Sequence, residues 1–362
     1  MTNVPSPDQA RCPFVAGGMI TDPRLFVGRK RELRDIALRM EGAQPISINV
    51  YGERRIGKSS LLYHFYQTWR QRVQDSSRYA VVYLSLQDAR ATTEAALYDA
   101  VAAALRPALP RRLHPALQQA NDRIGFARLV ETCCQQGILP VLCLDEFETL
   151  FRHRQAFDDD FYDAMRALMD RNQMMLVLAS HQPVDVYSHQ QRLTSRFFNL
   201  GHTMRLGELS DEEADELVRL PARAGSDTPP ALNRRQQLLA RRWGGRHPYR
   251  LQLAASCLWQ AAHTGRDERW ARRCFDEQAS RVLPGGSQRP LARIRGILAR
   301  TGTTVWRLPG AVGRLARRIG DAIDSAQNAV LGILALLIVA ALLLGWLRWD
   351  QVIGWLNSLA GN

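Results

Sequence analysis

One eight-residue segment constrains this 362-residue chain more than any other part of its sequence. It reads Gly52-Glu-Arg-Arg-Ile-Gly57-Lys58-Ser59 and fits the phosphate-binding pattern G-x-x-x-x-G-K-[ST] at every defined position. The glycines let such a loop turn back on itself, so that main-chain N–H groups point inward at phosphate oxygens. A β-rich run (46–51) precedes the segment and a helical pattern (59–74) follows it. The sequence therefore predicts a nucleotide-phosphate site between a strand and a helix.

The residues of this loop have separate expected roles. Lys58 is expected to reach the β- and γ-phosphates, and the Ser59 hydroxyl to bind Mg²⁺. Of the 48 Lys and Arg residues only Lys30 and Lys58 are lysines. In this Arg-rich chain, position 58 is therefore one of only two that carry the slim ammonium group that a phosphate loop needs. We expect the cofactor to contact the whole loop: Gly52, Glu53, Arg54, Arg55, Ile56, Gly57, Lys58, Ser59 and Ser60.

A second motif, Val141-Leu-Cys-Leu-Asp145-Glu146, consists of an apolar run that ends in two acids. Two adjacent carboxylates at the end of a buried strand are costly without a cation nearby. We expect Asp145 to hold Mg²⁺ through its water shell and Glu146 to polarise an attacking water. A solvated strand end is the alternative.

Strand-like and helical patterns alternate along the first two thirds of the chain. Apolar runs at 79–86, 138–144 and 174–179 are separated by helical patterns at 93–136 and 157–172. This alternation predicts an α/β fold, a parallel sheet sandwiched between helical layers. After Leu206 the strand signals stop, and helical segments from Ser210 to about Ala279 indicate a small all-α second domain.

Polar residues near the end of the fourth strand-like run are further candidates. Ser180 could touch the γ-phosphate or the attacking water, with His181 as the second choice and a turn cap as the alternative. Arg196, beside Phe197 and Phe198, could complete a neighbouring copy's site in trans, with Arg192 as the second choice. An ordinary surface arginine is the alternative.

Together these residues resemble the AAA+-like branch of P-loop ATPases, especially the archaeal-type and STAND ATPases related to origin-recognition proteins. The resemblance spans about residues 24–280 and implies ATP as the cofactor and ATP hydrolysis as the activity. Phe26-Val27-Gly28-Arg29 looks like the family's box near adenine, so Val27, Gly28 and Arg29 are implied cofactor contacts. Gly244-Gly-Arg-His-Pro-Tyr249, followed by Leu251-Gln252, looks like the lid signature. This implies that His247 and Pro248 lie over the nucleotide and that Arg246 or Arg250 acts as a second sensor.

The C-terminal region departs from that family. Ala329 to Leu347 is 19 residues without a charge, which as a helix would be about 28 Å long and close to the bilayer's hydrocarbon thickness. Nine Arg and no acid occur from Arg281 to Arg318. The apolar run predicts a single-pass transmembrane helix. The positive-inside rule then places residues 1–328 in the cytoplasm and the tail (348–362) outside it. A buried soluble helix is the alternative for the apolar run.

These patterns divide the chain into an N-terminal arm (1–24), a P-loop core (25–206), a helical lid (207–282), a basic amphipathic segment (283–328), a transmembrane helix (329–347) and a short tail (348–362). They predict an inner-membrane ATP-driven switch whose nucleotide state controls self-association or binding of a protein partner. One alternative is an ATPase that binds nucleic acid through residues 281–318. Another is a nucleotide-binding scaffold with negligible turnover.

Overall fold

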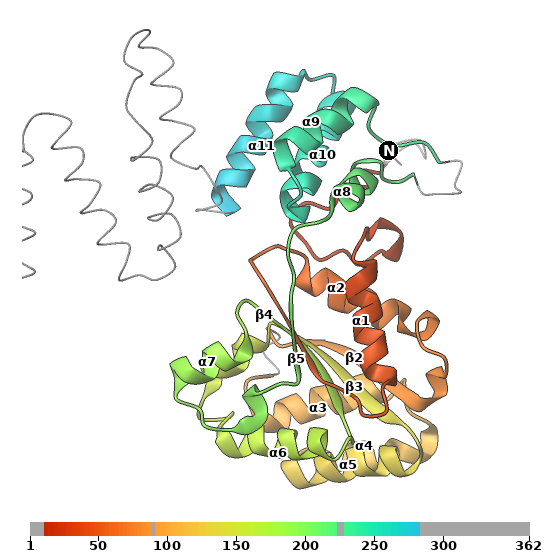
Figure 1. Ribbon diagram of the computed structural model, residues 1–362, viewed down its shortest axis with the longest axis vertical. Coiled ribbons are helices and arrows are strands. Elements are labelled where there is room, and N and C mark those ends of the chain that lie inside the picture. The colour runs from red at the N-terminus through yellow and green to blue at the C-terminus, as the bar shows by residue number, and fades with distance from the viewer. Residues whose placement is uncertain (1–10, 88–90, 223–227, 283–362) are drawn as a thin grey trace, which may run out of the picture. The chain divides into compact units, whose positions relative to one another are not determined.

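The computed structural model describes residues 11–87, 91–222 and 228–282 (Figure 1). The predicted basic segment (283–328), transmembrane helix (329–347) and tail lie outside these residues. Among the helices that are described, none combines the length and the apolar character needed to cross a bilayer.

The core is a five-stranded parallel sheet, as the alternating pattern predicts. Its strands are β1 (Ile48–Tyr51), β2 (Tyr79–Ser85), β3 (Leu139–Asp145), β4 (Met175–Ser180) and β5 (His202–Arg205), in the order β2-β3-β4-β1-β5. Register places Tyr51 beside Ser180 on one side and beside Arg205 on the other, while Asp145 pairs with Ser85. Because all strands run the same way, the segments after β1, β3 and β4 emerge at one edge, where open α/β sheets bind ligands.

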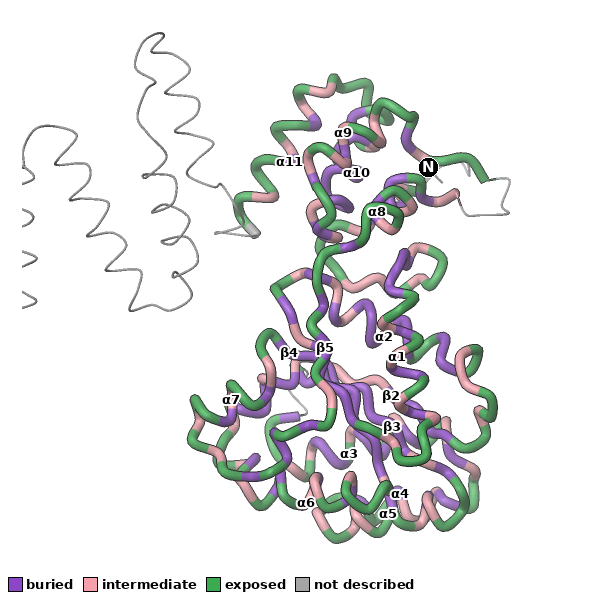
Figure 2. Tube along the Cα trace, viewed as in Figure 1, coloured by how far each residue is buried: buried purple, intermediate pink, exposed green. Residues whose placement is uncertain are grey.

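Both faces of the sheet are buried, which explains the continuous apolar runs (Figure 2). Alternate residues of a strand point to opposite faces. In β3, Val141 and Cys143 join one core with helix residues Leu33 and Phe65. Leu142 and Leu144 join a larger core on the other face.

Helices cover the two faces. The first core packs against α1 (Lys30–Glu41) and α2 (Lys58–Thr68). The second packs against α3 (Glu94–Leu105), α4 (His114–Gln118), α5 (Arg123–Gln135), α6 (Asp159–Asp170) and α7 (Val184–Gln191). Short 3₁₀ turns connect several elements, at Pro23–Leu25, Trp69–Gln71, Ser76–Arg78, Arg111–Leu113, Phe147–His153 and Arg196–Phe198.

A separate cluster of four helices follows the sheet: α8 (Asp211–Val218), α9 (Arg234–Gly244), α10 (Pro248–His263) and α11 (Glu268–Val282). Ser210 begins α8 with a capping box, in which its side chain accepts from Glu213 N–H. These helices have a core of their own, centred on α10, of whose 16 residues ten are buried, and Phe14 and Val27 from the N-terminal region belong to it. We call this cluster the helical unit.

Two features differ from the sequence-based expectation. The edge strand β5 carries no strand signal, because only Met204 of its four residues is buried. The helical stretch predicted over 93–136 is broken into α3, α4 and α5, with Pro107 and Pro110 in the first break. Proline lacks the N–H and clashes with the preceding turn, so it ends α3.

Candidate functional site

The phosphate loop connects β1 directly to α2. A Cβ at Gly52 would lie 2.6 Å from the Leu206 carbonyl oxygen, so only glycine allows the loop to leave the sheet this closely. Gly57 has φ +99° and forms the N-cap of α2, which begins at Lys58. The N-terminus of that helix therefore faces the loop, where main-chain N–H groups and the helix dipole favour an anion.

Lys58 is buried at the centre of the loop. Its Nζ donates hydrogen bonds to the carbonyl oxygens of Gly52 (2.8 Å) and Glu53 (3.0 Å). Burial lowers the pKa of Lys58, while the carboxylates of Glu148, Asp145 and Glu146 act in the opposite direction. An ammonium here thus lies close to three acids and to the loop's own carbonyls.

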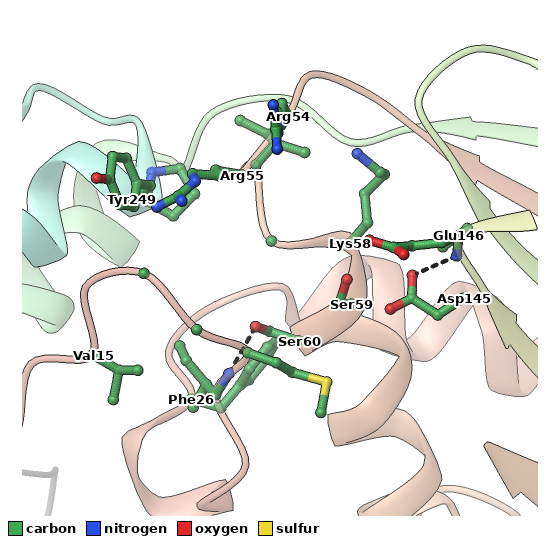
Figure 3. Close-up of a pocket in the computed structure, with 18 of the residues that line it drawn as sticks. Val15, Phe26, Arg54, Arg55, Lys58, Ser59, Ser60, Asp145, Glu146 and Tyr249 are labelled. Atoms are coloured by element: carbon green, nitrogen blue, oxygen red, sulfur yellow. Dashed lines mark hydrogen bonds between the residues drawn. The ribbon is translucent and has the colours of Figure 1, made fainter. Parts of the chain in front are cut away.

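Asp145 is held in place at the end of β3. Its Oδ2 accepts from the Tyr83 hydroxyl (2.9 Å) and its Oδ1 from the Glu146 N–H (3.0 Å). Ser59 and Asp145 line the same cavity, and their hydroxyl and carboxylate oxygens are ligands that Mg²⁺ prefers (Figure 3). Within the described residues no group of three or more His, Cys, Asp or Glu could hold a metal. Mg²⁺ usually keeps several water ligands and binds only one or two carboxylates together with substrate phosphates.

Glu146 has the properties of a candidate base. It adopts a left-handed conformation (φ +55°), and its Oε2 is buried without a hydrogen-bond partner among the described residues. Burial, followed by the charges of Asp145 and Glu148, raises the pKa of Glu146. A carboxylate with a raised pKa is a stronger proton acceptor.

A third acid, Glu148, was missed by the sequence analysis. It lines the cavity, its side chain is 10% exposed, and it contacts His181. The sequence signal was the second Glu of Asp145-Glu-Phe-Glu148, but only the folded structure shows that the 3₁₀ turn after β3 brings Glu148 to the cavity.

The prediction for Ser180 needs correction. Ala179 and His181 line the cavity, whereas Ser180 is fully buried, accepts from Asn49 Nδ2 (2.8 Å) and donates to the Gln182 carbonyl (2.6 Å). Residues i and i+2 share a face in an extended chain, so Ser180 points away when its neighbours point in. His181, the second choice, is the residue at the cavity.

The predicted arginines lie outside the cavity. Arg192 and Arg196 are exposed and do not line it, whereas Arg152, which the sequence analysis did not single out, does. The two candidate second sensors are also elsewhere: Arg246 lies 3.6 Å from acidic oxygens of Glu208 and Asp211, and Arg250 lies near Phe275.

Apolar residues make up much of the remaining lining of the cavity: Val15, Phe26, Val27, Leu209, Leu217, Pro248 and Tyr249. Arg55 also lines it, with its guanidinium over the ring of Tyr249. Figure 3 shows Val15 and Tyr249 on the opposite side of the phosphate loop from Asp145 and Glu146. Of the lid signature, Pro248 lines this region and His247 does not; His247 is buried, which lowers its pKa.

The box before α1 links the core to the helical unit. Arg29 is buried, and its Nη2 donates to the carbonyl oxygens of Ile56 (3.3 Å) and Gly207 (2.6 Å). Its main-chain N–H donates to Glu213 Oε1 (2.6 Å). Gly28, at φ +74°, leaves room for that carboxylate, because a Cβ there would lie 2.7 Å from Glu213 Cδ. Val27 and Arg29 line the cavity; Gly28 does not.

The whole cavity has a volume of about 920 Å³, near the upper end of the range for small-molecule sites. The loop residues Arg54 to Ser60 line it, while Gly52 and Glu53 contribute through the carbonyls that accept from Lys58. One end suits phosphates and a divalent cation, and the other suits a flat apolar group.

A parallel sheet with such a loop after β1 and paired acids after β3 places the chain among the P-loop nucleotide-binding proteins. Residues 16–267 match the family model of the AAA-like domain, and the chain belongs to that family. No curated protein sequence matches it.

Among solved structures, the chain is similar to the Aeropyrum pernix ORC2 protein in its ADPNP-ADP complexes. The identity is 16% and the TM-score 0.52, over 74% of this chain and 72% of that one. It is also similar to the Walker-type ATPase PABY2304 of Pyrococcus abyssi, with 16% identity and a TM-score of 0.50, over 78% and 79% of the two chains. These likenesses show a shared fold.

Proposed function

We propose that the protein binds ATP with Mg²⁺ in this cavity, hydrolyses it to ADP and phosphate, and works as a membrane-anchored switch. One observation carries the nucleotide assignment: Lys58 and three acids line a single cavity that also offers the apolar side chains of Val15, Pro248 and Tyr249. That combination matches a triphosphate joined to a base. The AAA-like family and the nucleotide complexes of the similar ORC2 protein support the same assignment.

In the proposed reaction, Glu146 accepts a proton from the water that attacks the γ-phosphate. Lys58 exchanges its two carbonyl partners for phosphate oxygens and offsets the charge that develops on them. Ser59 and Asp145 would hold Mg²⁺, which would supply positive charge to offset that of the phosphates. Tyr83 keeps the Asp145 carboxylate in position for that contact.

A neighbouring copy of the chain would supply a further positive charge at the γ-phosphate. Arg196, or Arg192, is exposed and outside its own cavity, which suits a residue that acts in trans. Arg152 is a candidate for the same role within one chain. Self-association on ATP binding is therefore part of the proposal.

The switch uses the connection between the loop and the helical unit. Arg29 contacts the Ile56 carbonyl, the Gly207 carbonyl in the segment after β5, and Glu213 of α8, so a change in the loop reaches the helical unit through one residue. A nucleotide that binds both sides would favour their closed arrangement.

Binding and turnover are tested with three proteins: wild type, Lys58→Ala and Glu146→Gln. ATP binding is measured by calorimetry and hydrolysis by phosphate release. We expect Lys58→Ala to lose ATP binding, and Glu146→Gln to bind ATP but hydrolyse it at least tenfold more slowly. Retained affinity in Lys58→Ala would refute the phosphate-loop assignment. Equal hydrolysis by wild type and Glu146→Gln would remove Glu146 from catalysis and favour a scaffold without turnover.

Membrane anchoring rests on the uncharged run from Ala329 to Leu347 and on the Arg cluster before it, with the ATPase part on the cytoplasmic side. Deleting residues 329–347 should release the protein into the soluble fraction. A full-length chain that is already soluble without detergent would refute the anchor. Binding of the 281–318 region to DNA but not to anionic liposomes would favour the nucleic-acid alternative.

A further inference from the structure

Gln252, in α10, is a buried polar residue at the apolar end of the cavity. It is 3% exposed and lines the cavity together with Val15, Leu217 and Tyr249. A polar amide among such neighbours needs hydrogen-bond partners to offset its burial. Gln252 belongs to the stretch that resembles the lid signature, but neither that resemblance nor the proposed reaction gives it a role.

The orientation of the Gln252 amide is fixed by the N-terminal arm. Val15 N–H donates to Gln252 Oε1 at 3.0 Å. Because a main-chain N–H can only donate, the oxygen must face Val15 and the NH₂ group must point elsewhere. The arm itself is held on both sides of this contact, since Phe14 is buried in the helical unit and Ile20 N–H donates to Ser60 Oγ at 3.0 Å.

The Gln252 Nε2 group is buried and has no hydrogen-bond partner among the described residues. Such groups are rare in folded proteins, and a ligand is one of the partners that can satisfy them. The surrounding residues indicate what kind of ligand could satisfy this group. Phe26, Pro248 and Tyr249 offer apolar surface for a flat ring, while Gln252 offers a hydrogen-bond donor. A purine has both features, an apolar face and ring nitrogens that accept hydrogen bonds.

We propose that Gln252 Nε2 donates a hydrogen bond to a ring nitrogen of adenine, so that Gln252 helps to bind the base and Val15 holds it in the donating orientation. This inference rests on the proposed ATP binding. The N-terminal arm thereby contributes to binding of the base. Rotation of the Gln252 amide would turn the NH₂ group away from the base, and it would also break the hydrogen bond from Val15 N–H.

The test compares ATP with 1-deaza-, 3-deaza- and 7-deaza-ATP, each of which replaces one ring nitrogen by C–H. Affinities are measured by calorimetry on the full-length chain in detergent. We expect wild type to bind one analogue roughly 5- to 100-fold more weakly than ATP, which is the effect of leaving one buried donor unpaired. The other two analogues should bind within about twofold of ATP. Equal binding of all four nucleotides by wild type would overturn the proposal.

Gln252→Met keeps the side chain's length and removes the donor. We expect Gln252→Met to weaken ATP binding by at least the same factor, because it also removes the oxygen that accepts from Val15 N–H. It should bind ATP and the analogue that wild type binds weakly with equal affinity, because the donor that distinguishes them is gone. A merely structural role for Gln252 would weaken all four nucleotides alike and leave the discrimination intact. Gln260→Met is the matched control, since Gln260 is exposed on the same helix and should leave all affinities unchanged.

Failure of this inference can be told from failure of the proposed function. If wild type does not bind ATP, or Lys58→Ala binds it as well as wild type, the ATP site itself is wrong. If wild type binds ATP, Lys58→Ala does not, and the three analogues bind like ATP, only the role of Gln252 is wrong.

Discussion

The guanidinium of Arg55, in the phosphate loop, lies over the ring of Tyr249 in α10, with 4.4 Å between Cζ and the ring centroid (Figure 3). Arg55 adopts φ +63°, a conformation uncommon for a residue with a side chain. The loop backbone therefore presents this side chain to the helical unit, and both residues line the cavity.

This contact predicts that the ring of Tyr249, and not its hydroxyl, supports nucleotide binding. Cation–π contacts contribute about 0.5–2 kcal/mol, depending on exposure. We expect Tyr249→Leu to weaken ATP binding roughly 3- to 30-fold, measured by calorimetry. Tyr249→Phe retains the ring and should bind like wild type. Equal weakening by both variants would contradict a role for the stacked guanidinium.

Tyr83 is predicted to act through Asp145. Burial, together with the charge of Asp145, raises the pKa of the Tyr83 hydroxyl, so it remains a donor at all ordinary pH values. Hydrogen bonds to charged groups contribute about 1.5–3 kcal/mol. We therefore expect Tyr83→Phe to raise the Mg²⁺ concentration for half-maximal hydrolysis about tenfold or more, with ATP binding in EDTA unchanged. Tyr66→Phe, a tyrosine of α2 outside the cavity lining, is the control. An unchanged Mg²⁺ dependence in Tyr83→Phe would count against this positioning role.

The raised pKa of Glu146 predicts a pH-dependent stability. A carboxyl whose pKa is higher in the folded than in the unfolded protein binds more protons when folded. Stability is therefore lost as pH rises through the folded pKa and is regained as pH falls. In the absence of nucleotide we expect Glu146→Gln to melt at a higher temperature than wild type at pH 7. That gain should vanish below the unfolded pKa, since Glu146 is then protonated in both states. A gain that does not change with pH would show that charge is not its cause.

Arg29 is predicted to be a main link between the core and the helical unit. Arg29→Met would leave the carbonyl oxygens of Ile56 and Gly207 without this donor. We expect the free energy of unfolding to fall by roughly 2–4 kcal/mol, measured by urea unfolding followed by tryptophan fluorescence. Arg31→Met, at an exposed position in the first turn of α1, should change it by less than about 0.5 kcal/mol. Similar losses in both variants would refute a special role for Arg29.

Local patterns predicted most of the core. The loop, the strand before it, the acidic end of β3 and the capped start of α8 follow from residues close together in sequence, and the structure contains each of them. The parallel sheet flanked by helices is confirmed. Strand β5 could not be predicted this way, because its place comes from pairing with β1 and not from its own apolar content.

The site was predictable only in part, because the remaining features depend on contacts distant in sequence. Whether Ser180 or His181 reaches the cavity depends on the orientation of β4 and on Asn49, whose Nδ2 donates a hydrogen bond to the Ser180 hydroxyl. The hydrogen bond between Tyr83 and Asp145 crosses from β2 to β3. The roles of Val15 and Gln252 required the arm and α10 to meet, although they are 237 positions apart.

The path of the arm bears on how the domain should be cut for study. The family match begins at residue 16, so a fragment designed from it would lack Phe14 and Val15. Phe14 fills the core of the helical unit, and Val15 fixes the Gln252 amide. Such a fragment would keep every residue of the phosphate loop and lose the N–H that orients Gln252. A truncation at residue 11 would keep both features and is the better boundary for crystallisation or assay.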